Sequence, residues 1–255
     1  MTTDAAAPSR RRLGPGFWGF IALMLALTVL WIALGVWQLQ RLDWKEGLIA
    51  EVSERMAAPP VPLPAAAQWP TLDLTNFSYR PVTVSGRYLG SGTILVFTSL
   101  SDAKGEASGP GYWVMAPFVP DGGGTVFVNR GFVPQASGPQ FAATPPPTGE
   151  LTLAGIALDP EPAGPFTPGP DTAGHIEWVR DPLRLAAMDR TAGPVFGMTI
   201  DAPAGAPGAL PQGGETSVDF PNNHFGYALT WFGFAILTPA LLAYWVRRQL
   251  RPRQS

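Results

Sequence analysis

Two long apolar runs lie near the ends of the chain. Residues 17–39 have only two polar side chains, Thr28 and Gln38, and residues 225–246 contain no Asp, Glu, Lys or Arg. As helices rising about 1.5 Å per residue, runs of this length reach roughly 33–35 Å, which is enough to cross a bilayer. The pattern predicts transmembrane helices over the first run and over 224–246.

A signal peptide is the alternative interpretation of the first run, because Arg10, Arg11 and Arg12 precede it. Signal peptides have apolar cores of about 7–15 residues and end in a small-residue cleavage site. This run is longer and lacks an Ala-x-Ala motif, so we expect a retained helix. Helical spacing of apolar residues continues as far as Met56, and Pro59 is expected to end the helix.

The segment between the two runs alternates apolar and polar residues in short stretches, as β-strands do. The expected strands are 79–89, 93–99, 112–119, 125–133, 151–158 and 195–200, with one short helix at 181–190. Asp121 to Gly124 predicts a hairpin turn, and Gly86 predicts a bulge or a close approach. The long loops expected between these elements are rich in Pro and Gly and cover 134–149, 159–174 and 201–217. The expected fold is a membrane protein with two transmembrane α-helices flanking a mainly antiparallel β external domain, arranged as a small sheet or barrel.

The charges are distributed unevenly along the chain. Residues 1–39 and 224–255 hold seven Arg and one Asp, whereas residues 40–223 hold ten Lys or Arg and 18 Asp or Glu. By the positive-inside rule the N-terminal tail 1–16 and the C-terminal tail 247–255 are cytoplasmic and residues 40–223 are external. The external side is the periplasm if the membrane is a bacterial inner membrane, which we expect, or the intermembrane space of a mitochondrion.

Sequence signatures of catalysis are missing. The chain has no Cys, which excludes disulfides, thiolate metal sites and c-type haem attachment. It also has no nucleophile elbow, dinucleotide fingerprint, P-loop or zinc-protease motif, so an enzyme is not expected. The only histidines are His175, in a loop where we expect ordinary surface, and His224. The segment 129–132, Asn-Arg-Gly-Phe, is interpreted either as a surface feature or as a buried edge.

His224 lies at the mouth of the second span, where Tyr227, Ala228 and Trp231 share its helix face. An imidazole at that depth is costly without a partner or a function. The alternative is a cap or a contact with lipid headgroups, since His, Tyr and Trp are common interfacial anchors.

A second set of polar and aromatic residues marks the external end of the first span. One side of the first helix is expected to carry these residues, near His224 if the two helices pair: Trp37, Arg41, Trp44 and Lys45. The more usual role of such residues is an aromatic belt with cations reaching the headgroups, and this alternative stays open.

Three motif blocks occur together at a specific spacing. The first is Gly35-x-Trp37-Gln38-x-x-Arg41-x-x-Trp44-Lys45, the second joins residues 84–89 to Val128-Asn129-Arg130-Gly131-Phe132-Val133-Pro134, and the third is residues 222–232. In their order and topology they resemble the Surfeit-locus-protein-one family of cytochrome c oxidase assembly factors. The resemblance runs from about Phe17 to Arg248 and lapses in the Pro/Gly-rich segment 201–217.

The resemblance implies a function in maturing the catalytic subunit of cytochrome c oxidase by assisting haem a insertion. It implies that His224 ligates the haem iron, a role for which a neutral imidazole is well suited. From position we expect Trp37, Tyr227 and Trp231 to pack the macrocycle and Arg41 or Lys45 to neutralise the propionates. The expected partners are the catalytic subunit, other assembly factors and membrane lipid, and no nucleic acid. A cofactor-free membrane adapter that stabilises an assembly intermediate is the alternative function.

Overall fold

The computed structural model describes residues 14–90, 92–216 and 222–251. The chain divides into two compact units, Met1–Ala50 with Asp219–Ser255 and Glu51–Val218, and each is described by itself. Most of the expected N-terminal tail, the last residues of the C-terminal tail and Ser217 lie outside the described residues.

The first unit contains one long helix and most of a second, whose last residues, 51–57, belong to the other unit. α1 (Pro15–Ala57) includes the expected span and continues until Ala57, two residues before Pro59, as predicted. α4 (His224–Leu250) begins at His224 and runs past the expected end at 246. Both helices are long and apolar enough to cross a membrane. Most of their large apolar side chains are exposed, unlike those of a core helix in a soluble protein.

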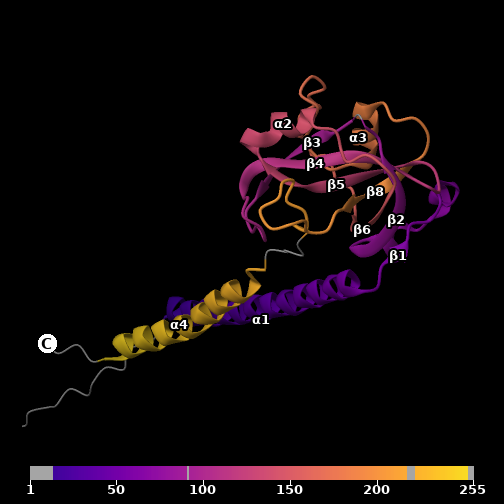
Figure 1. The fold of residues 1–255 in the computed structure, drawn as a ribbon. Coiled ribbons are helices and arrows are strands. Elements are labelled where there is room, and N and C mark those ends of the chain that lie inside the picture. Colours follow the sequence, from indigo (N-terminus) through magenta and orange to yellow (C-terminus); the bar gives the residue numbers. More distant parts are fainter. Residues whose placement is uncertain (1–13, 91, 217–221, 252–255) are drawn as a thin grey trace, which may run out of the picture. The chain divides into compact units, whose positions relative to one another are not determined.

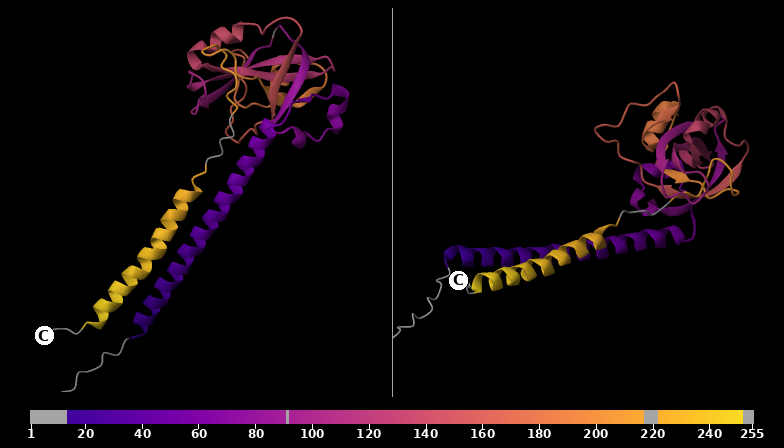
Figure 2. Two further views of the ribbon diagram at one scale, coloured as in Figure 1. Left: turned by 60° about the horizontal axis from the view of Figure 1, so that its bottom comes forward. Right: turned by 90° about the vertical axis from the view of Figure 1, so that its left-hand side faces the viewer.

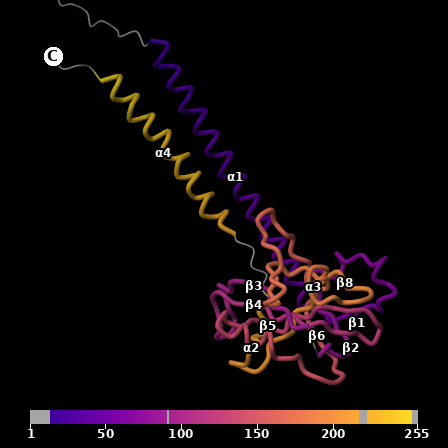
Figure 3. Tube along the Cα trace, turned by 90° about the horizontal axis from the view of Figure 1, so that it is seen from above, coloured from indigo at the N-terminus to yellow at the C-terminus, as the bar shows by residue number. Residues whose placement is uncertain are grey.

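α1 and α4 run side by side in opposite directions (Figures 2 and 3). Near one end, Phe17 and Phe20 contact Trp245, with ring centroids 5.2 and 4.5 Å apart. Near the other, Gln38 of α1 contacts His224 at the start of α4. The expected pairing of the two helices is therefore present in the structure.

The second unit is built on one sheet, and all of its strands except β7 are labelled in Figure 1. The strands are β1 (Val61–Pro62), β2 (Arg80–Tyr88), β3 (Ile94–Leu100), β4 (Gly109–Pro120), β5 (Thr125–Pro134), β6 (Leu151–Leu158), β7 (Ile176–Glu177) and β8 (Val195–Asp201). The short helices are η1 (Ala66–Thr71), η2 (Leu74–Phe77), η3 (Gln135–Ser137), α2 (Gly138–Ala143) and α3 (Pro182–Asp189). Each expected strand has its counterpart in this set, and β4 and β5 form the predicted hairpin around Asp121 to Gly124.

The sheet closes into a ring. β2, β6, β8, β5 and β4 pair in that order, and the end of β4 pairs back onto β2. Gly86 lies at this closure opposite Pro120, where an added Cβ would be 2.1 Å from the carbonyl oxygen of Val119. Only glycine allows the two backbones to approach so closely, which confirms the close approach predicted from the sequence.

The expectation of a mainly antiparallel sheet is wrong, because the sheet is mixed. β1 pairs with β2, β7 with β3, and β8 with β5 in parallel, whereas the remaining pairs are antiparallel. The parallel pairing of β8 with β5 arises from the long connection that follows β6. It contains α3, so the chain crosses over before β8 and inserts that strand between β5 and β6.

Apolar side chains fill the ring and its outer faces. The inner cluster includes Val84 of β2, Phe118 of β4, Val128 of β5 and Met198 of β8. These side chains follow the alternation that the sequence predicts for half-buried strands. Outside the ring, α3 packs Leu185 against β3, β4 and β5. The predicted helix at 181–190 is confirmed as α3, which Asp181 caps by accepting a hydrogen bond from the Leu183 N–H at 2.8 Å.

Candidate functional site

His224 is the first residue of α4, and its ring is half-buried against α1. Its Nδ1 lies 2.7 Å from Oε1 of Gln38. Gln38 is only 8 % exposed, although it stands in an otherwise apolar helix. An amide buried among apolar side chains is costly unless it is hydrogen-bonded, and His224 supplies that bond.

A stripe of α1 residues brings Gln38 to this place. Trp31, Gly35 and Gln38 recur at spacings of four and three, so they share one helix face. A Cβ at Gly35 would lie 2.7 Å from the ring of Phe232, so the glycine lets α4 come close. Trp231 stacks on Trp31 with centroids 5.3 Å apart and planes 10° from parallel. Among the described residues, the buried Nε1 of Trp231 has no hydrogen-bond partner.

The other expected site residues on α1 lie off this stripe. Trp37 is 50 % exposed, and the Arg41 guanidinium lies 4.5 Å from the ring centroid of Trp44. Lys45 is half-buried. A residue next to Gln38 along a helix is rotated by about 100° from it, which explains why Trp37 does not share the stripe.

On α4 the expected residues separate in the same way. Ala228 is buried and Trp231 faces α1, whereas Tyr227 is 56 % exposed. The structure thus brings His224 and Trp231 onto the helix pair and leaves Trp37, Tyr227 and Arg41 on exposed surface. Sequence reasoning missed Gln38 and Trp31 as their partners. The available signal was that Gln38 is one of only two polar side chains in the first apolar run.

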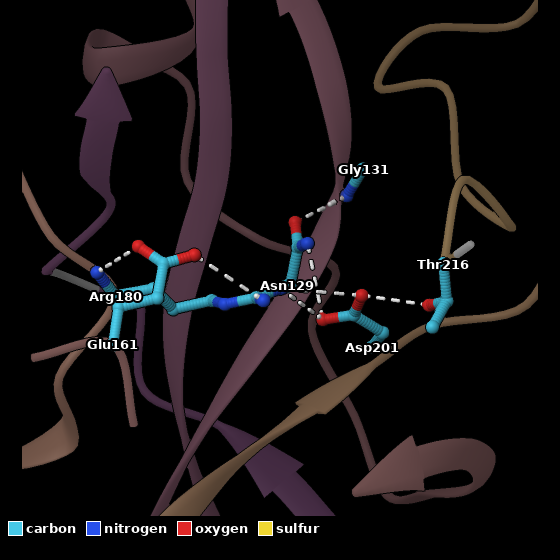
Figure 4. A network of polar contacts seen from close by, with 6 residues as sticks. All are labelled: Asn129, Gly131, Glu161, Arg180, Asp201 and Thr216. Carbon is cyan, nitrogen blue, oxygen red and sulfur yellow. Dashed lines mark hydrogen bonds and ion pairs between the residues drawn. The ribbon is translucent and has the colours of Figure 1, made fainter. Parts of the chain in front are cut away.

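The Asn-Arg-Gly-Phe segment lies in β5 between β4 and β8 and is buried except for the half-buried Arg130, so it is not a surface feature. Asn129 donates to Oδ1 of Asp201 at 3.1 Å and accepts from the Gly131 N–H at 3.0 Å (Figure 4). Asp201 also accepts from Nη1 of Arg180 at 3.1 Å and from the hydroxyl of Thr216 at 2.7 Å. This network ties β5 and β8 to the two loops that carry Arg180 and Thr216, so its function is structural.

Arg130 and Tyr88 interact electrostatically. Burial raises the pKa of Tyr88 to about 12, and the positive charge of Arg130 opposes this shift. Burial likewise lowers the pKa of Arg130, with Tyr88 opposing the shift. Nη1 of Arg130 is buried and has no hydrogen-bond partner among the residues described.

His175 is exposed, as expected, and adopts a positive φ of 52°. Its charge acts on Asp189, whose pKa burial raises, while the Thr191 hydroxyl and His175 oppose that shift. His175 belongs to the β unit, whereas His224 belongs to the unit that contains α4.

The single imidazole of His224 suits a metal ion whose other ligands come from a cofactor rather than from protein side chains. Within the described ranges, no group of three or more His, Cys, Asp or Glu side chains could hold a bare ion. A haem iron receives four nitrogens from its porphyrin and needs only an axial ligand from the protein. His224 offers one imidazole, with Nδ1 already bonded to Gln38 and Nε2 remaining for such a bond.

Comparison with known proteins identifies the family. The family model described as "SURF1 family" matches residues 25–236. The chain is 36 % identical over 231 residues to Surfeit locus protein 1 of Rattus norvegicus, covering 86 % of this chain and 72 % of the relative. It is 34 % identical over 266 residues to Surfeit locus protein 1 of Homo sapiens, covering 98 % and 83 %. A SURF1-like protein of Monosiga brevicollis is 32 % identical over 261 residues, covering 96 % and 92 %. The chain belongs to the SURF1 family.

Proposed function

We propose that this protein is a membrane-bound assembly factor for cytochrome c oxidase. In this proposal it binds haem a through His224 and assists the insertion of haem a into the catalytic subunit of the oxidase. Its partners are that subunit, other assembly factors and the lipid of a bacterial inner membrane. The function requires binding and release of a cargo and no chemical step by the protein.

The observation that carries this proposal is the placement of His224. Its imidazole stands at the start of an apolar helix, with one ring nitrogen 2.7 Å from Gln38. An imidazole partly buried between apolar helices is costly without a partner or a function. The position suits an amphipathic cargo whose ring and farnesyl tail are apolar and whose propionates require water or cations.

The surroundings of His224 support the same cargo. Trp37 and Tyr227 present large exposed rings, and Trp231 has a buried indole N–H that a polar ring substituent can satisfy. Arg41 and Lys45 carry positive charge one and two turns beyond Trp37 on α1, where propionates can pair with them.

The decisive test compares haem a content in protein purified from cells that make haem a. Wild type is expected to copurify with haem a, and His224→Ala is expected to lose at least nine-tenths of it, because the axial bond is gone. His175→Ala is the matched control, since it removes an exposed imidazole from the other unit and should leave the haem content unchanged. Equal haem content and identical spectra in wild type and His224→Ala would refute ligation by His224, and the absence of haem a from all three proteins would favour the cofactor-free adapter.

A further inference from the structure

We propose that Gln38 is a positioning residue that fixes the tautomer of His224 and thereby makes Nε2 the ligand atom. The proposal rests on the proposed function of His224 as a haem ligand. It assigns to Gln38 the task of holding the hydrogen of the imidazole on Nδ1.

The chemistry of the contact determines where the hydrogen is. A neutral imidazole has one N–H donor and one nitrogen with a lone pair. The Gln38 atom that faces Nδ1 is the carbonyl oxygen Oε1, at 2.7 Å, and this oxygen can only accept. Nδ1 therefore donates, and the lone pair lies on Nε2. With the amide in this orientation, the opposite tautomer would place two lone pairs facing each other at 2.7 Å, and Nε2 would carry a hydrogen that prevents ligation.

The contact between His224 and Gln38 resembles the contact that a metal-binding histidine makes through its second ring nitrogen. Histidine ligands usually donate the second ring nitrogen's hydrogen to a carbonyl or carboxylate, which fixes the ring orientation and raises its basicity. Removing such a partner typically weakens metal affinity by about 10–100-fold. Gln38 supplies this carbonyl from a neighbouring helix, so ring orientation depends on the pairing of α1 and α4.

The burial of Gln38 keeps its side chain on the face of α1 that meets α4. Its side chain is 8 % exposed, on the face of α1 that contains Gly35 and meets α4. Gln40, two residues later, is exposed on the opposite side of α1. The two glutamines have the same chemistry and differ in whether they face His224, which makes Gln40 a matched control.

The first measurement uses haem-free, full-length protein with ¹⁵N-labelled histidine in detergent micelles. Couplings between ring protons and ring nitrogens distinguish the two neutral tautomers. Wild type and Gln40→Leu are expected to carry the hydrogen of His224 on Nδ1. Gln38→Leu is expected to shift it towards Nε2, the tautomer that free imidazole side chains prefer. Gln38→Glu, which when ionised presents only acceptor oxygens, should keep it on Nδ1.

The second measurement is titration of the same variants with haem a. Gln38→Leu should bind about 10–100-fold more weakly than wild type. Gln40→Leu should bind as wild type does, and Gln38→Glu should bind more tightly than Gln38→Leu. A hydrogen on Nε2 in haem-free wild type would overturn the proposal, as would Gln38→Glu behaving like Gln38→Leu in both measurements.

The two proposals fail in different ways. If His224→Ala binds haem a as wild type does, the proposed function fails, while the tautomer measurement still reports the contact between Gln38 and His224. If His224→Ala loses haem a but Gln38→Leu keeps both the tautomer and the affinity of wild type, only the positioning role of Gln38 is wrong.

Discussion

Trp31 of α1 stacks on Trp231 of α4, with ring centroids 5.3 Å apart and planes inclined by 10°. Phe234 joins them, 5.6 Å from Trp31 and 6.1 Å from Trp231. Between this aromatic contact and His224 lies Gly35, against which the Phe232 ring packs. In a membrane, lipid is as apolar as these side chains, so helix pairing depends on such close packing rather than on burial from water. The position of His224 beside Gln38 therefore depends on a small residue at 35.

Replacing Gly35 by Val is expected to separate the two helices. The new Cβ would lie 2.7 Å from the Phe232 ring, so the ring or the helix must move. Because the chain contains no Cys, cysteines introduced at Phe20 and Trp245, whose ring centroids are 4.5 Å apart, report the pairing through cross-linking with a bifunctional thiol reagent. We expect the cross-linking yield to fall several-fold in Gly35→Val.

The control for this experiment is Gly233→Val. Gly233 follows Phe232 on α4, and a Cβ there meets no atom within 4 Å. Gly233→Val therefore changes helix propensity as Gly35→Val does, but leaves the interface between the helices untouched. Equal loss of cross-linking in both variants would contradict the packing explanation.

Gly86→Ala is expected to destabilise the β unit by at least about 2 kcal/mol, as strain at a special backbone position does. Its Cβ would be 2.1 Å from the backbone oxygen of Val119, which cannot rotate away. Gly90→Ala is the control, because nothing lies within 4 Å of its added Cβ. The thermal unfolding midpoint of the full chain in detergent measures the difference, and an unchanged midpoint in Gly86→Ala would show that the closure of β4 onto β2 tolerates the methyl group.

Asp201→Ala should lower the free energy of unfolding by about 3–5 kcal/mol, the range for breaking a buried ion pair. The side chains of Asp201 and Arg180 are 7 % and 13 % exposed, and the change leaves a buried guanidinium without that partner. Glu161→Gln also removes a carboxylate from Arg180, but Glu161 is 44 % exposed and its oxygen is 3.4 Å from Nη2. We expect this second loss to cost less than about 1 kcal/mol in denaturant unfolding of the full chain. Similar costs for the two variants would argue against a buried network.

Alkaline pH should destabilise the β unit through Tyr88. Its pKa is raised from 10.0 to about 12 by burial, so between these values the unfolded chain loses the phenolic proton and the folded chain keeps it. Stability is therefore full below pH 10 and falls as pH rises towards 12, by about 2–3 kcal/mol for a shift of this size. Tyr88→Phe removes the titrating group, so its free energy of unfolding should vary less between pH 10 and 12. A pH dependence equal to that of wild type would refute the role of Tyr88.

Local patterns in the sequence predicted most of the elements in this structure. The apolar runs, the capping Asp181 and the turn glycines after Asp121 each act through a few neighbouring residues, so one stretch of sequence suffices to recognise them. The parallel pairing of β5 with β8 could not be found in this way. It depends on a crossover through the connection between β6 and β8, whose sequence predicts only loops and a short helix. The order of strands in a sheet is not encoded within any one strand.

The candidate site was predictable to a similar extent. His224 stands out because it is one of two histidines and begins an apolar run. Its partner was harder to identify, because Trp37, Gln38 and Arg41 lie within one helical turn and the face that meets α4 depends on packing. Gly35 and Gln38 share that face because they are three residues apart, whereas Trp37 is rotated away from it. In a polar segment Gln38 would give no signal, but in an apolar run a buried amide indicates a partner.

The orientation in the membrane is the last prediction. Seven Arg in the flanks and the net charge of −8 over residues 40–223 predict, by the positive-inside rule, that both termini are cytoplasmic. Alkaline phosphatase fused after Glu106, between β3 and β4, is expected to be active, because it folds only outside the cytoplasm. Green fluorescent protein fused at the C-terminus is expected to fluoresce, because it folds inside. Exchanging the two reporters is the control and should abolish both signals. Fluorescence from the fusion after Glu106 would reverse the topology and would place His224 and Gln38 at the cytoplasmic side.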